Sequence, residues 1–205
     1  MKKNQSSKTW IIKQHRDQFF KKSKILGYRS RSAFKLLELN KKFKFISNRT
    51  SLIDIGSSPG GWSQVASEMI KNGKIIAIDK KSMEGIKNVR FYQGDFSDSK
   101  IKNKLLDLLP EKVDVVISDM ASDTTGNKSL DCIRTNLLCE DVIDFSVKII
   151  KPNGKVISKL FMGEDFLKVK KQAEKKFKKV NFFKPESSRD ESKETYIHCA
   201  YLNTL

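Results

Sequence analysis

Residues 51–64 read SLIDIGSSPGGWSQ, and this stretch decides the fold. Its first part, 51–55, is a short apolar run typical of a buried strand. The glycine-rich turn that follows leads into apolar positions at helical spacing, which are Trp62, Val65, Ala66 and Met69. A strand, a glycine turn and a helix in this order form the opening unit of nucleotide-type α/β folds.

Apolar strand patterns and amphipathic helix patterns alternate along the rest of the chain. Further strands are expected at 74–79, 89–93, 113–119, 155–161, 179–183 and 195–202, with helices at 99–109, 131–150 and 164–178. Right-handed crossovers between parallel strands place helices on each side of the sheet. The sequence therefore predicts a doubly wound α/β fold, with a seven-stranded, mostly parallel sheet covered on both faces.

Positive charge is concentrated at the N-terminal end. The chain has a formal net charge of +17, and residues 1–46 hold eleven Lys and three Arg against Asp17 and Glu38. Apolar spacings in this segment predict two helices, broken near Gly27. A basic surface of this kind attracts RNA or DNA. The alternative is a protein that uses lysine as a general surface residue, although an even distribution would then be expected.

Candidate RNA contacts follow from this charge. The arm offers basic side chains for phosphate contacts at Lys8, Lys13, Arg16, Lys21, Lys22, Arg29 and Arg31. Most of its aromatic residues are expected to pack the helices onto the domain. The lysine-rich helix at 164–178 is either a second RNA-binding surface or a solvated helix face.

Several other kinds of protein are disfavoured. No run reaches the eighteen or more apolar residues of a membrane span, and the first residues lack a secretory core and an Arg-rich presequence. Three cysteines without CxxC spacing (Cys132, Cys139 and Cys199) and only two histidines argue against a metal site. We expect a cytoplasmic, metal-free monomer.

Acidic residues at strand ends suggest the cofactor. Asp54, Asp79, Asp95 and Asp119 are all expected near carboxyl ends of strands, where ligands of such sheets bind. The GxGxxG pattern of dinucleotide enzymes is absent, and Pro59 removes one amide from a phosphate cradle. S-adenosylmethionine has no phosphate but carries a cationic amine and a ribose diol, so it suits carboxylates. The alternative role for each acid is to cap a helix.

Five ordered motifs carry a family resemblance: GYRSRSAFKL (27–36), DIGSSPGGWSQ (54–64), QGDF (93–96), SDMAS (118–122) and SSR…ETY (187–196). The chain resembles the FtsJ/RrmJ family of ribose methyltransferases in its bacterial stand-alone form. The resemblance implies a Rossmann-like S-adenosylmethionine-dependent methyltransferase domain at 47–205, with 1–46 as a basic helical arm packed on it. It implies cofactor contacts at Asp54, Gly56, Pro59, Gly60, Gly61, Trp62, Asp79, Asp95, Phe96 and Asp119.

The same resemblance implies a catalytic set. Lys35, Asp119, Lys159 and Glu194 match the Lys-Asp-Lys-Glu residues of the family. Lys159 can act as general base only when its amine has lost its proton, which burial and the charge of Lys35 would promote. Asp119 and Glu194 oppose that loss and are expected to orient the two lysines. Without the resemblance, Lys35 would read as an ordinary exposed helix lysine.

The implied substrate is a uridine ribose in large-subunit ribosomal RNA, within a nearly assembled particle. The alternatives are methylation of transfer-RNA anticodon loops, a catalytically silent RNA-binding assembly factor and a small-molecule methyltransferase. In one loop the chain departs from the family, which more often has Pro and Asn where this sequence has Ser122 and Asp123. An extra negative charge there puts the identity of the substrate in doubt.

Overall fold

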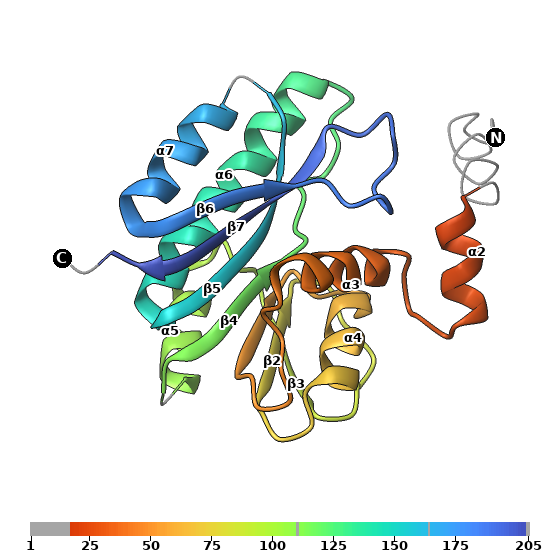
Figure 1. Ribbon diagram of the computed structural model, residues 1–205, viewed down its shortest axis with the longest axis vertical. Helices are drawn as coiled ribbons and strands as arrows, with labels where there is room; N and C mark the ends of the chain where they lie inside the picture. The colour runs from red at the N-terminus through yellow and green to blue at the C-terminus, as the bar shows by residue number, and fades with distance from the viewer. Residues whose placement is uncertain (1–16, 110, 164, 204–205) are drawn as a thin grey trace.

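The computed structural model describes residues 17–109, 111–163 and 165–203 (Figure 1). Its helices are α2 (Gln18–Ile25), α3 (Ser32–Phe43), α4 (Gly61–Met69), α5 (Ser99–Leu108), α6 (Lys128–Ile149) and α7 (Phe166–Lys176). Its strands are β1 (Leu52–Ile55), β2 (Ile75–Asp79), β3 (Val89–Gln93), β4 (Val113–Ser118), β5 (Ile150–Phe161), β6 (Phe177–Phe183) and β7 (Glu194–Leu202). No helix in these ranges is long and apolar enough to cross a membrane.

The strands form one seven-stranded sheet in the order β3-β2-β1-β4-β5-β7-β6. All pairs from β3 to β5 are parallel, and β7 lies antiparallel between β5 and β6. The predicted mostly parallel sheet is confirmed. The antiparallel strand matters for the site, because its first residue lies at the edge where its neighbours end.

Helices cover both faces of the sheet (Figure 1). On one face, α5, α6 and α7 pack against the sheet through buried residues such as Leu105, Ile143 and Val169. On the other, α3 and α4 bury a second cluster that includes Leu36, Trp62 and Tyr196. The two layers enclose a buried central sheet, as the continuous apolar runs of β1 and β4 required.

The described part of the basic arm forms the two predicted helices. The carboxylate of Asp17 caps α2 by accepting hydrogen bonds from the amides of Phe19 and Phe20. Gly27 then takes a positive φ of 72°, which glycine adopts without strain and which allows the chain to turn toward α3. Because α3 buries three residues in the second cluster, it is part of the core. The division at residue 46 stays a prediction.

Some boundaries differ from the predicted ones. Helix α6 begins three residues earlier than expected, where the side chain of Asn127 accepts hydrogen bonds from two amides and caps it. Helix α7 ends at Lys176, because Phe177 already pairs with Leu202 in the sheet. Asp54 is not at a strand end; it is the third residue of β1 and is buried.

The connection from α4 to β2 is packed too closely for a side chain at Gly73. A Cβ atom there would lie 2.0 Å from the carbonyl oxygen of Thr50, and this backbone cannot move independently because the amide of Leu52 bonds to the carbonyl of Lys74. Gly85 provides a comparison, since a Cβ atom there meets nothing within 4 Å.

We predict that Gly73→Ala lowers the free energy of unfolding by about 1–3 kcal/mol, because the added methyl group forces two backbone segments apart. Gly85→Ala should change it by less than about 0.5 kcal/mol. Urea denaturation followed by circular dichroism measures both. Equal effects of the two substitutions would show that packing at Gly73 is not the constraint.

Candidate active site

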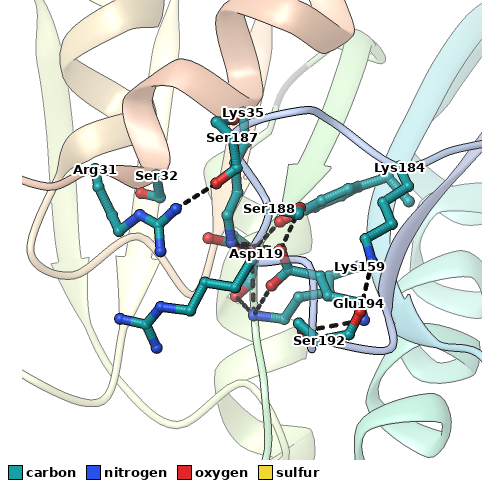
Figure 2. Close-up of polar contacts among 12 residues, drawn as sticks. Arg31, Ser32, Lys35, Asp119, Lys159, Lys184, Ser187, Ser188, Ser192 and Glu194 are labelled. Atoms are coloured by element: carbon teal, nitrogen blue, oxygen red, sulfur yellow. Dashed lines mark hydrogen bonds and ion pairs between the residues drawn. The ribbon is translucent and has the colours of Figure 1, made fainter. Parts of the chain in front are cut away.

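The structure brings together the four residues that the resemblance singled out for catalysis (Figure 2). Lys35 comes from α3, Asp119 follows β4, Lys159 lies near the end of β5, and Glu194 begins β7. Three of these elements end or begin at the same edge of the sheet, and α3 reaches that edge from the side. We refer to these residues as the tetrad.

Direct contacts hold the tetrad. The Lys159 ammonium lies 3.1 Å from Oδ1 of Asp119 and 2.7 Å from its backbone carbonyl oxygen. The Lys35 ammonium lies 2.7 Å from Oε1 of Glu194 and 3.9 Å from Oδ1 of Asp119. Glu194 also reaches toward Lys159, with 3.9 Å between Oε2 and Nζ. Each lysine therefore faces both carboxylates.

The tetrad is shielded from water, which strengthens its electrostatics. Its side chains are between 8% and 18% exposed. Burial alone would raise the pKa of Asp119, but the charges of Lys159 and Lys35 and a hydrogen bond from Tyr196 hold that pKa below its usual value. Asp119 is thus a carboxylate at neutral pH, able to direct both ammonium groups.

Two further residues support the tetrad; both lie in the SSR…ETY motif, but neither was predicted as a site residue. The hydroxyl of Tyr196 donates to Oδ1 of Asp119 at 2.6 Å, and the hydroxyl of Ser188 donates to Oε1 of Glu194 at 2.7 Å. The pKa of Tyr196 is raised by burial and by the neighbouring carboxylates, so its hydroxyl keeps the proton that it donates. Strand periodicity could have indicated Tyr196, since it lies two residues after Glu194 on the same face.

Helix α3 also holds the segment that carries Ser188. The carboxylate of Glu38 accepts hydrogen bonds from the amides of Glu186 and Ser187. Arg31 donates to the carbonyl of Ser187 (Figure 2). Arg31 also pairs with Asp17 at 2.6 Å. These contacts connect the arm to the edge of the tetrad.

Two of the predicted RNA contacts, Arg29 and Arg31, have a structural role in the fold. Arg31 is only 18% exposed and is engaged by Asp17 and Ser187. Arg29 donates to the carbonyls of Glu84 and Gly85, both at 2.7 Å, and so ties the arm to the segment before β3. Both guanidinium groups thus hold segments of the protein together, and their contact with RNA stays a prediction.

The other predicted RNA contacts divide by position. Lys21 and Lys22 are exposed on α2, and Lys22 lies 5.3 Å from the ring centre of Phe34. Lys8, Lys13 and Arg16 lie outside the described residues.

A cavity of about 480 Å³ adjoins the tetrad at Asp119. It is lined by five of the ten predicted cofactor residues: Gly56, Asp79, Asp95, Phe96 and Asp119. Leu137 and Leu138 of α6 add an apolar wall. Gly56 has a φ of 80°, and a Cβ atom there would lie 2.1 Å from Cγ of Met120, so only glycine suits this position. The cavity combines carboxylates with flat apolar surface.

The remaining predicted cofactor residues lie outside the cavity lining. Trp62 is buried, donates to the carbonyl of Ser32 and packs on Tyr196. A Cβ atom at Gly61 would lie 2.2 Å from the Ser30 hydroxyl, and at Gly60 it would lie 2.9 Å from Ile86. Pro59 is likewise absent from the lining, and its carbonyl faces the Arg29 guanidinium. This part of the glycine turn therefore packs against the arm, through Arg29 and Ser30, and against Ile86 in the segment before β3.

Asp54 lies beneath the turn. Its Oδ2 accepts a 2.6 Å hydrogen bond from Ser63, whereas Oδ1 has no hydrogen-bond partner among the described residues. Burial raises its pKa to about 7, although the hydrogen bond from Ser63 acts in the opposite direction.

The loop that departs from the family contributes to the cavity. Ser122 and Asp123 both line it, and Asp123 pairs with Lys80 across the rim at 3.3 Å. Ser122 is held in turn by the Thr135 hydroxyl and the Asp131 carbonyl. The additional negative charge is therefore partly compensated by Lys80, although a surface pair of this kind is weak.

Comparisons with known proteins agree with this geometry. Residues 28–202 match the family model of FtsJ-like methyltransferases. A protein of Pelagibacter ubique named ribosomal RNA large subunit methyltransferase E is 46% identical over 202 residues, which cover 98% of this chain and all of that protein. A ribosomal RNA methyltransferase of Plasmodium falciparum is 35% identical with a TM-score of 0.77, covering 85% of this chain and 98% of that chain.

A more distant structure shares the fold alone. A methyltransferase of Streptococcus mutans, solved in complex with SAH, is 12% identical with a TM-score of 0.53, covering 84% of this chain and 96% of that chain. Together with the sheet order, these likenesses confirm the predicted Rossmann-like methyltransferase fold.

The raised pKa of Asp54 predicts a pH-dependent stability. Between about pH 4 and pH 7 the folded protein keeps a proton that the unfolded chain has released, so the free energy of unfolding falls as pH rises. The fall attributable to Asp54 is at most on the order of 4 kcal/mol. Asp54→Asn should remove it.

The measurement is urea denaturation of wild type and Asp54→Asn at pH 5 and pH 8. The variant should gain stability relative to wild type at pH 8. A difference between the two proteins that stays constant with pH would mean that Asp54 is ionised throughout.

Proposed function

The chain belongs to the family of FtsJ-like methyltransferases, and from this membership we propose that it methylates the ribose 2′-hydroxyl of a uridine in large-subunit ribosomal RNA. The family membership confirms the resemblance seen in the sequence. The observation that carries the proposal is the buried tetrad beside a carboxylate-lined cavity.

We propose S-adenosylmethionine as the cofactor held in that cavity. When bound, this cofactor supplies an electrophilic methyl group carried on a sulfonium. The lining fits it because Asp79 and Asp95 offer carboxylate oxygens for a ribose diol, an amine and an adenine amino group, and Leu137 and Leu138 offer an apolar surface. Both oxygens of Asp79 are already oriented by amides of Ser58 and Lys81, so the carboxylate is held in one direction.

The tetrad can orient and deprotonate a hydroxyl. Lys159, in the form whose amine has lost its proton, is the proposed acceptor of the hydroxyl proton, since that amine lies beside Asp119 at the edge of the cavity. Asp119 holds that amine in position and is itself held by Tyr196. Lys35 and Glu194 form the other side of the tetrad, where they can fix the ribose by charge-assisted hydrogen bonds.

The choice of ribosomal RNA is supported by the name of the Pelagibacter relative, which aligns along its whole length. The exposed lysines of α2, Lys21, Lys22 and Lys24, provide a basic surface for RNA phosphates. The proposed setting is the cytoplasm, the proposed active form is a monomer, and the proposed substrate is the assembled large subunit.

We predict that Lys159→Ala lowers kcat for methyl transfer by about 10²–10⁴-fold, because a positioned proton acceptor is lost. Labelled methyl transfer to purified large ribosomal subunits, naked ribosomal RNA and bulk transfer RNA provides the measurement. Binding of S-adenosylmethionine, followed by calorimetry, should be retained.

Lys155→Ala is the matched control. It lies in the same strand, but its amine contacts the carbonyl of Lys44 away from the tetrad, so kcat should stay within about two-fold. Label found only in transfer RNA would support the proposed methyl-transfer reaction but contradict ribosomal RNA as the substrate. Cofactor binding without transfer to any RNA would indicate a silent assembly factor.

A further inference from the structure

A second cavity lies at the other side of the tetrad. This groove has a volume of about 430 Å³ and runs between the start of α7 and the segment that leads into β7. It is lined by Met162, Phe166, Phe182, Phe183, Lys184, Ser192, Lys193, Glu194 and Thr195. Glu194 therefore belongs to both the groove and the tetrad, just as Asp119 belongs to both the tetrad and the first cavity.

Its walls are aromatic and its rim is basic. The rings of Phe166 and Phe182 are tilted at 50° with centres 4.5 Å apart, and both are partly exposed. Met162 is 47% exposed beside them. At the rim, Lys193 is exposed and the ammonium of Lys184 contacts only backbone carbonyls in its described hydrogen bonds, those of Asp190 and Ser192. Carbonyl contacts leave the lysine charge available to a phosphate.

We propose that this groove receives an unpaired base of the RNA substrate that flanks the methylated nucleotide. A flat base with an attached phosphate combines a stacking surface with negative charge, and the groove offers aromatic and thioether surface beside ammonium groups. The proposal rests on the proposed function, since it places the base within reach of a ribose at the tetrad.

Strand geometry explains why a flanking base fits better than the methylated nucleotide itself. Lys159 and Tyr196 are paired neighbours in the sheet and face α3, as does the tetrad. Phe182 and its paired neighbour Ile197 pack on the α7 side. Phe183, which also lines the groove, pairs with Tyr196 and packs on the α3 side. The groove thus extends from the tetrad at Glu194 around the sheet edge to the α7 side, so an RNA strand that crosses this edge would place neighbouring nucleotides in the two sites.

The groove is also continuous with the tetrad through the backbone. The amide of Met162 donates to the carbonyl of Lys193 at 2.9 Å, which extends the β5–β7 pairing past Glu194. Figure 2 shows Ser192 and Lys184 beside Glu194, on the segment that forms this wall. A ligand in the groove would therefore contact a segment whose backbone is hydrogen-bonded to β5 next to the tetrad.

The test introduces a negative charge inside or just outside the groove. Met162→Glu places a carboxylate among the aromatic side chains, whereas Leu167→Glu places it on a 62% exposed residue that does not line the groove. The KM for large ribosomal subunits and the Kd for a ten-nucleotide single-stranded RNA, from fluorescence anisotropy, are measured for each. We expect Met162→Glu to raise both about ten-fold or more, with kcat within about three-fold of wild type.

Leu167→Glu should leave both values within about two-fold, and Met162→Ala, which adds no charge, should give an intermediate loss. Equal losses for the two glutamate variants would overturn the proposal, because the effect would then be general repulsion. A raised KM for subunits with an unchanged Kd for the oligonucleotide would also overturn it and indicate a ribosomal protein in the groove. If wild type transfers no methyl group, the proposed function is wrong. The Kd for the oligonucleotide still tests whether the groove binds an RNA base.

Discussion

Two lysines and two carboxylates buried at one edge of the sheet are the constraint on which the rest of the structure depends. A buried charge is costly unless it is paired and hydrogen-bonded, so neither lysine is tolerable without the opposite carboxylates. Asp119 and Glu194 pair with both lysines, and the hydroxyls of Tyr196 and Ser188 donate to the same carboxylate oxygens, Oδ1 of Asp119 and Oε1 of Glu194. The four charges can therefore be buried together only where α3, β4, β5 and β7 meet at that edge.

The antiparallel strand makes this meeting possible. In a fully parallel sheet, the first residue of β7 would lie at the opposite edge from the ends of β4 and β5. Because β7 runs against β5, Glu194 pairs with Phe161 and lies next to Lys159. The same reversal joins the 184–193 segment to the sheet edge. Both the tetrad and the aromatic groove follow from the direction of one strand.

The glycines of the turn do not all line the cavity, although the motif predicted cofactor contacts for each of them. Gly56 faces the cavity, whereas Gly60 and Gly61 allow close packing of Ile86 and Ser30. The motif thus helps to place the arm as well as to shape the cavity. This placement matters for the chemistry, because Lys35 belongs to the arm and reaches Glu194 only when α3 is seated on α4.

Local sequence patterns were sufficient for the α/β class, the seven strands and the two helices of the arm, because burial and glycine geometry act over a few residues. The identity of the tetrad also came from ordered motifs in the chain. Only the tertiary structure decided which charges are paired. Arg31 pairs with the carboxylate of Asp17 and donates to the carbonyl of Ser187, and Arg29 donates to the backbone carbonyls of Glu84 and Gly85. Such contacts join residues far apart in the chain, so composition and local periodicity cannot predict them.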